Sequence, residues 1–109
     1  MSTFSDFENA VVAGVKDLAK GSLKDYLQQA QDDAKDYLVK SRQKLALWTA
    51  ALASGDLSGL EFEGLVNSEA GLAAMEGLKQ VGIAAADIQR FRDALIKLVI
   101  DSAFKAFLP

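Results

Sequence analysis

The chain has 109 residues, of which 50% are hydrophobic and 25% are charged, and its net charge is −3. This length fits a single domain over residues 1–109, and the composition is typical of a globular protein rather than a disordered one. The chain has no cysteine and no histidine. Disulfides and thiolate catalysis are therefore excluded, as are the commonest general base and the commonest transition-metal ligand.

The first predicted helix runs from about Asp6 to Lys20. Ser5 and Glu8 have the spacing of a capping box, in which two side chains satisfy free backbone N–H groups at a helix start. Gly21 is expected to end this helix, because glycine adopts positive φ without strain. Apolar residues recur at three- and four-residue steps along one helix face: Phe4, Phe7, Val11, Val15 and Leu18.

The second predicted helix is the longest and runs from about Leu23 to Ala53, with Ser22 and Asp25 as its start signal. No glycine or proline interrupts it before Gly55. A helix of about 30 residues is roughly 45 Å long at 1.5 Å per residue, so we expect that it makes the molecule elongated, kinks, or projects toward a partner. Its apolar stripe consists of Leu23, Leu27, Ala30, Ala34, Tyr37, Ser41, Leu45, Trp48 and Leu52.

Acidic residues cluster on this second helix. Paired carboxylates can perform acid–base chemistry or bind a divalent metal. The apolar stripe, however, places Asp32, Asp33 and Asp36 outside the core, so we interpret them as part of a solvated face. Without histidine, the sequence offers no metal site of the Glu-x-x-His kind found in helical bundles.

Basic residues also gather in two places, at Lys40, Arg42 and Lys44 and at Arg90 and Arg92. Nucleic-acid binding usually needs a basic face on a basic domain. Here the chain is acidic, and neighbouring residues of a helix point in different directions. The sequence therefore disfavours nucleic acid as a partner.

Two shorter helices are predicted between the two long ones. Ser58 and Glu61 form a second capping box, which indicates a helix over about Gly59–Val66. Ser68 is expected to start another helix over about Glu69–Val81, and Gly82 to end it.

The last predicted helix runs from about Ala86 to Phe107. Its charged residues Asp93, Lys97, Asp101 and Lys105 are spaced by four, which confines them to one narrow stripe. Most other positions are apolar, so this helix is either central in a bundle or covered by another chain.

The predicted fold is an all-α, elongated bundle of four to five helices with one long helix and an apolar C-terminal helix. The two long helices are expected to pack near antiparallel at about 20°. The first residues lack the basic and apolar regions of a secretory signal, and no apolar stretch reaches the 20 or so residues of a membrane span. A cytoplasmic protein, not an integral membrane protein, is the expectation.

No catalytic residues, cofactor site or metal site can be assigned from the sequence. The first hypothesis is a protein–protein interaction or assembly module that associates with itself or with another protein. The alternative is a protein of the membrane surface or a lipid carrier, suggested by the long amphipathic helix and its repeated Lys-Asp-Tyr-Leu at residues 24–27 and 35–38. The expected interface residues are large apolar ones: Phe91, Leu95, Leu98, Val99, Phe104, Phe107 and Trp48.

Overall fold

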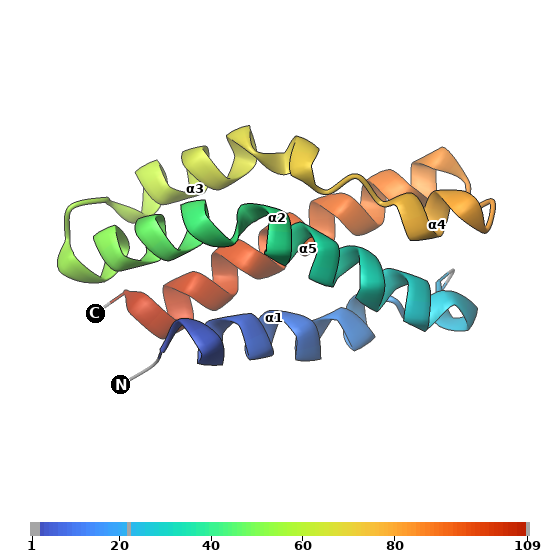
Figure 1. The fold of residues 1–109 in the computed structure, drawn as a ribbon, viewed down its shortest axis with the longest axis horizontal. Helices are drawn as coiled ribbons and strands as arrows, with labels where there is room; N and C mark the ends of the chain where they lie inside the picture. The colour runs from blue at the N-terminus through green and yellow to red at the C-terminus, as the bar shows by residue number, and fades with distance from the viewer. Residues whose placement is uncertain (1–2, 22, 109) are drawn as a thin grey trace.

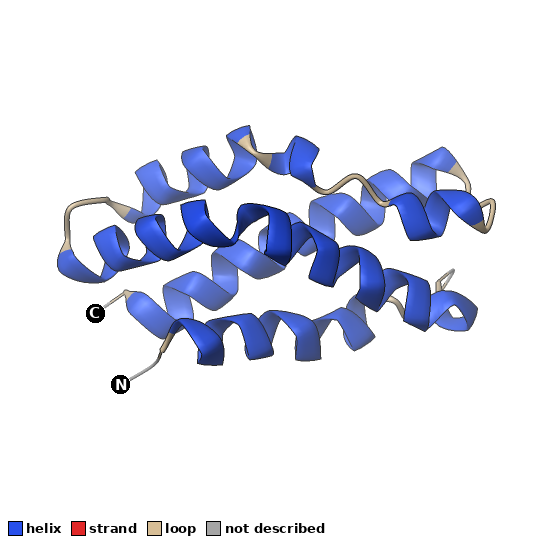
Figure 2. Ribbon diagram, viewed as in Figure 1, coloured by secondary structure: helices blue, strands red, loops and turns tan. Residues whose placement is uncertain are grey.

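The computed structural model describes residues 3–21 and 23–108, and every regular element in these ranges is helical (Figure 2). The predicted all-α bundle, with one long helix and an apolar C-terminal helix, is confirmed. Two short 3₁₀ turns, η1 (Lys24–Tyr26) and η2 (Ala70–Leu72), precede α2 and follow α3. The α-helices are α1 (Phe4–Leu18), α2 (Leu27–Ser54), α3 (Gly59–Ser68), α4 (Glu76–Gln80) and α5 (Ala85–Phe107).

The helices lie along the long axis of a bundle that measures 42 × 24 × 20 Å (Figure 1). α1 runs away from the end where both termini lie, α2 returns, α3 and α4 share the next pass, and α5 returns again (Figure 1). The expected antiparallel arrangement of α2 and α5 is therefore wrong. They run in the same direction because the pass through α3 and α4 lies between them in the chain. α1 runs opposite to both and packs against each.

The capping box of α1 is not the predicted one. The helix begins at Phe4, and Thr3 and Asp6 form the box in place of Ser5 and Glu8. Thr3 Oγ1 accepts a hydrogen bond from the Asp6 N–H at 3.1 Å, and the Asp6 carboxylate accepts one from the Thr3 N–H at 3.0 Å. The bond from the Thr3 backbone lowers the pKa of Asp6. The earlier start places Phe4 inside the helix, where its ring can pack.

The long helix is close to its predicted extent. η1 leads directly into α2, so helical backbone runs from Lys24 to Ser54. Ser22, the expected cap, lies outside the described residues. α2 ends where Gly55 adopts a left-handed conformation with φ of 86°, as expected for a residue without a Cβ.

The third pass is only partly as predicted. The Ser58–Glu61 capping box of α3 is confirmed, and the hydrogen bond from the Ser58 backbone lowers the pKa of Glu61. The continuous helix expected over Glu69–Val81 is wrong, since η2 and α4 are separated by non-helical backbone in which Met75 has a φ of 60°. Ser68 does not cap a new helix; its hydroxyl donates to the Leu65 carbonyl.

α5 agrees with the prediction and forms one wall of the core. Asp93, Lys97, Asp101 and Lys105 are all exposed, so the predicted polar stripe faces outward. Its buried residues are Ile88, Phe91, Leu95, Ile96, Val99, Ile100 and Ala103. The sequence left open whether the bundle itself or another chain covers this helix. In the structure, neighbouring helices of the same chain cover it. Among the described residues, no helix has both the length and the apolar character needed to cross a bilayer.

Candidate functional site

The apolar residues expected at an interface are used in packing within the chain. Phe91, Leu95 and Val99 are fully buried. Leu98 is half-buried against α1, where a Cβ on Gly14 would come within 2.8 Å of its side chain.

The other three expected interface residues are half-buried near the end of the bundle that holds the termini. The ring of Phe104 lies 6.0 Å from that of Phe62, and the ring of Phe107 lies 6.0 Å from that of Phe7. Trp48 packs against the edge of the core. All seven expected residues therefore contribute to the fold, and only Phe107 also lines the surface groove described below.

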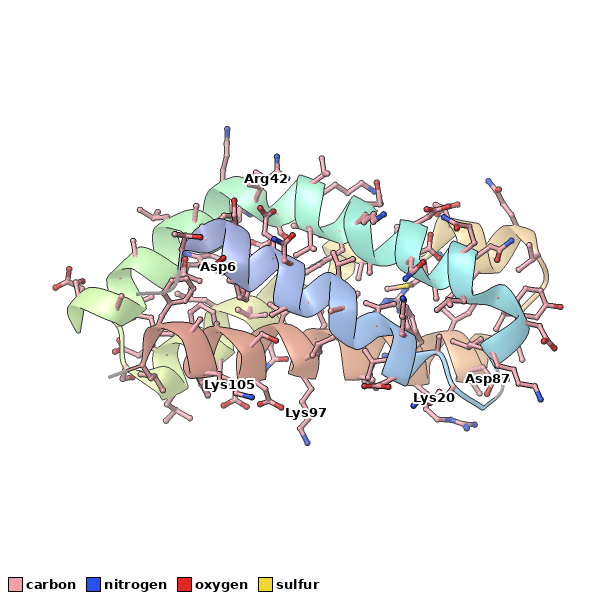
Figure 3. The ribbon with its side chains drawn as sticks, turned by 90° about the horizontal axis from the view of Figure 1, so that it is seen from below. Asp6, Lys20, Arg42, Asp87, Lys97 and Lys105 are labelled. Carbon is pink, nitrogen blue, oxygen red and sulfur yellow. The ribbon has the colours of Figure 1, made fainter. Side chains whose placement is uncertain are left out.

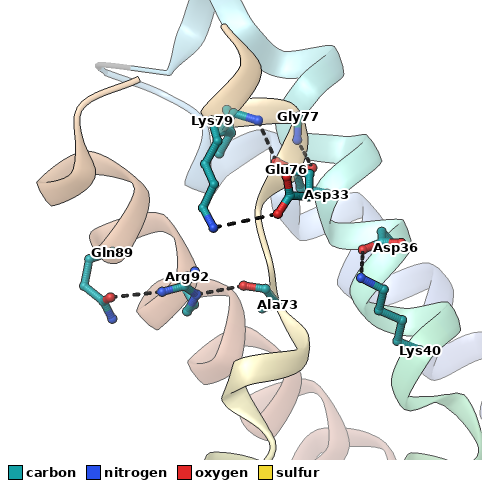
Figure 4. A network of polar contacts seen from close by, with 10 residues as sticks. Asp33, Asp36, Lys40, Ala73, Glu76, Gly77, Lys79, Gln89 and Arg92 are labelled. Carbon is teal, nitrogen blue, oxygen red and sulfur yellow. Dashed lines mark hydrogen bonds and ion pairs between the residues drawn. The ribbon is translucent and has the colours of Figure 1, made fainter. Parts of the chain in front are cut away.

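Asp33 is the most unexpected polar residue, because the sequence placed it toward solvent and that prediction is wrong. Its side chain is buried between α2 and α4, with 6% of the residue exposed (Figure 4). Its two carboxylate oxygens accept hydrogen bonds from the N–H groups of Gly77 and Leu78 at 2.8 and 2.9 Å. Asp33 thus caps the start of α4 from a neighbouring helix and satisfies N–H groups that lack a partner within α4.

Arg92 of α5 contacts the non-helical segment between η2 and α4 from the other side. Its Nε donates to the Ala73 carbonyl at 2.8 Å, and its Nη1 donates to Gln89 at 3.1 Å (Figure 4). Gly77 leaves room for the carboxylate, since a Cβ at this position would lie 2.9 Å from Asp33 Oδ1. We call Asp33, Arg92 and the backbone of Ala73 to Leu78 the polar clamp; its geometry fixes the chain path.

Most of the other charged side chains in the described ranges lie on the surface. Asp32 and Asp36 are exposed as predicted, and Asp25 is exposed as well. Within residues 3–21 and 23–108, no three acidic side chains come close enough together to hold a metal ion. Figure 3, in which α1 lies in front of α2 and α5, shows Lys97 pointing away from the ribbon.

The expected basic patch on the second helix is divided among three ion pairs. Lys40 contacts Asp36 on the same helix at 2.9 Å. Arg42 contacts Glu8 of α1 at 3.2 Å, and Lys44 contacts Glu69 after α3 at 2.7 Å. These side chains therefore contact acids in three different parts of the chain.

Tyr37 is a buried aromatic residue of the second helix, and its pKa is raised. Only 1% of it is exposed, and burial raises the pKa of Tyr37 to about 12 because the phenolate would lose its hydration. The negative charge of Glu69 contributes in the same direction. The raised pKa keeps the phenol protonated and does not mark a catalytic base.

Two large apolar side chains are exposed on the outside of α2. Val39 is 64% exposed and Leu47 is 69% exposed. Between Lys44 and Asp56 the chain has no charged residue. We define the outer face of α2 as the exposed residues Val39, Gln43, Ala46, Ala50 and Ala53, with Leu47 beside them.

A shallow groove borders this face at the end of the bundle that holds the termini. It lies between the C-terminal part of α2, the end of α5 and the start of α1, and no charged side chain lines it. Its walls are Phe4, Ala46, Thr49, Ala50, Ala53, Ala106 and Phe107.

The sequence contains a signal for this face that the apolar stripe obscured. Val39, Gln43, Ala46, Ala50 and Ala53 are spaced four, three, four and three residues apart. That spacing places all five residues on one face of the helix, and four of the five are apolar. Because alanine occurs on both buried and exposed faces of α2, composition alone could not separate this second stripe from the first.

Comparisons with protein families, curated proteins and solved structures return no match for this chain.

Proposed function

We propose that this chain is a helical assembly module that associates through the outer face of α2, primarily with a second copy of itself. The observation that carries this proposal is the exposure of Val39 and Leu47 on a helix face whose other residues are Gln43 and three alanines, none of them charged. A protein gains free energy when a partner removes such apolar surface from water. Contiguous apolar patches on a soluble chain commonly mark interaction sites.

The contrast with α5 supports the choice of surface. α5 carries more large apolar residues than the outer face of α2, yet Phe91, Leu95 and Val99 are covered by the chain itself. The outer face of α2 has no such cover. Alanines at 46, 50 and 53 would let the backbone of a second helix come close, because their side chains are short.

The observations favour a protein partner over a membrane surface. Interfacial helices present large apolar side chains to the lipid and basic residues beside them. In α2 the large apolar residues Tyr37, Leu45 and Leu52 face the core. The face that remains outside carries mainly alanine, which would contribute little to binding a bilayer.

Sedimentation velocity over the micromolar range tests the proposal. We expect reversible association of the natural chain and a monomer for Ala50→Arg, which puts a long charged side chain at the middle of the outer face. Ala13→Arg makes the same change at an exposed position of α1 and should associate normally. Circular dichroism would establish that both variants are folded. A natural chain that remains monomeric throughout, or equal association of the two variants, would overturn the proposal.

A further inference from the structure

The edge of the outer face has charges of opposite sign at its two ends. Lys40, Leu47 and Ser54 are exposed and seven residues apart, so they lie along one side of α2. The Ser54 hydroxyl lies 3.0 Å from the Asp56 carboxylate and 3.1 Å from the Ala51 carbonyl, its two acceptors, so this acid lies at the end of the same edge. The edge therefore runs from Lys40, which also contacts Asp36 one turn earlier at 2.9 Å, through an exposed leucine to an anion.

We infer that a second copy of this chain packs antiparallel on the outer face of α2, about a two-fold axis near Leu47. This inference rests on the proposed function and specifies its partner and geometry. In an antiparallel pair centred between Ala46 and Ala50, Ala46 of one copy packs against Ala50 of the other. Gln43 then lies opposite Ala53, which continues the packing layers toward both ends of the face.

The same arrangement makes the charged edge complementary to itself. Lys40 of each copy comes opposite the Ser54–Asp56 end of the other, and Leu47 meets Leu47 near the axis. A two-fold interface uses each contact twice, so the pair of opposite charges occurs at both ends. The Leu47 side chain, 69% exposed in one chain, becomes covered.

A parallel pair does not have this complementarity. In a parallel pair in register, a residue on one edge of the interface lies beside the residue five positions later on the opposite edge of the partner helix. Positions 35 and 40 therefore come together across the interface. Both are lysines, and like charges in such positions repel. Asp56 would have no cation of the second copy opposite it. The charge pattern therefore selects the antiparallel direction.

Charge reversal with rescue tests the direction of the pair. In sedimentation velocity, Lys40→Glu and Asp56→Lys should each weaken dimerisation about tenfold, because each change affects two contacts. The double variant exchanges the two charges and should regain most of the affinity. Lys97→Glu makes the same charge change as Lys40→Glu at an exposed position of α5 and should have no effect.

Single-cysteine cross-linking provides a second measurement, since the natural chain has no cysteine. Leu47→Cys, oxidised by dissolved oxygen with copper phenanthroline, should give a disulfide-linked dimer quickly. Leu60→Cys, at a position on α3 that is 81% exposed, should react slowly through random encounters.

The outcomes separate the inference from the proposed function. A dimer that Ala50→Arg disrupts, but that shows no charge rescue and no rapid cross-link at position 47, overturns the antiparallel geometry alone. A chain that stays monomeric overturns both. Charge rescue together with preferential cross-linking at position 47 supports both.

Discussion

The two ends of the bundle are held together by different kinds of contact. At the α4 end, the polar clamp attaches a broken segment to α2 through Asp33 and to α5 through Arg92. At the end that holds the termini, aromatic rings from α1 and α5 pack together, with Phe7 lying 5.5 Å from Phe4 and 6.0 Å from Phe107. The α4 end has directed hydrogen bonds in addition to buried apolar residues such as Met75 and Leu78, and the other end relies on packed aromatic rings.

This difference explains where surface remains for a partner. Hydrogen bonds specify the path of a short irregular segment, because an unpaired backbone group is costly when buried. Apolar packing specifies the path of the chain less strictly than hydrogen bonds do. On the outside of α2, small apolar residues extend from this packing onto the surface. The surface proposed for association therefore extends toward the apolar end of the molecule.

The largest expected effect is at the apolar end, for Phe7→Ala. Phe7 is 1% exposed and contacts the rings of Phe4 and Phe107. Removing a buried phenylalanine leaves a cavity and typically costs about 3–5 kcal/mol. Urea denaturation should show this loss of unfolding free energy. A loss below about 1 kcal/mol would mean that this end does not depend on aromatic burial.

The next effect is at the polar clamp, for Asp33→Ala. The substitution leaves the Gly77 and Leu78 N–H groups without their acceptor, which should cost about 2–3 kcal/mol. Asp33→Asn retains one acceptor oxygen and should lose roughly half as much. Hydrogen exchange of the Leu78 amide should accelerate in the alanine variant more than in the asparagine variant. Equal protection in both would show that the carboxylate does not hold α4.

A third expectation concerns alkaline pH and Tyr37, on the core side of α2. The pKa of Tyr37 is raised from 10.0 to about 12 by burial, so the folded chain keeps its proton after the unfolded chain has lost it. Stability is therefore unaffected below about pH 10 and falls as pH rises from about 10 to 12, by up to about 2–3 kcal/mol. Urea denaturation as a function of pH measures the loss. Tyr37→Phe should lack this part of the loss, and an unchanged pH profile would contradict the assignment.

The regular helices were predictable because their signals are local. The Ser58–Glu61 capping box, the uninterrupted stripe of α2 and the polar stripe of α5 each depend on residues a few positions apart. The same reasoning failed over Glu69–Val81, where a contact between Asp33 and Gly77, far apart in the chain, decides the backbone. A local pattern cannot contain such a contact.

The candidate surface was less predictable than the fold for a related reason. A large apolar residue on α5 has the same sequence signal whether its own chain or a partner covers it. The helices that pack against α5 decide this, and α1, α2 and α3 all do so in the folded chain. Asp33 did carry a weak signal, because it follows Ala30 by three residues and precedes Tyr37 by four, at the edge of the buried stripe.

The smallest expected effect on stability is at the outer face of α2, for Leu47→Ser. Leu47 is 69% exposed, so removing its side chain should change the unfolding free energy of the monomer by less than about 0.5 kcal/mol. Association should nevertheless weaken, because Leu47 lies where the two copies are proposed to meet. Leu45→Ser is the opposite case, since Leu45 is 1% exposed and its loss should destabilise the fold itself. Denaturation of dilute protein measures the first quantity, and sedimentation velocity measures the second. If Leu47→Ser destabilised the monomer as much as Leu45→Ser, the outer face would belong to the core, and the distinction between packing surface and docking surface would not hold.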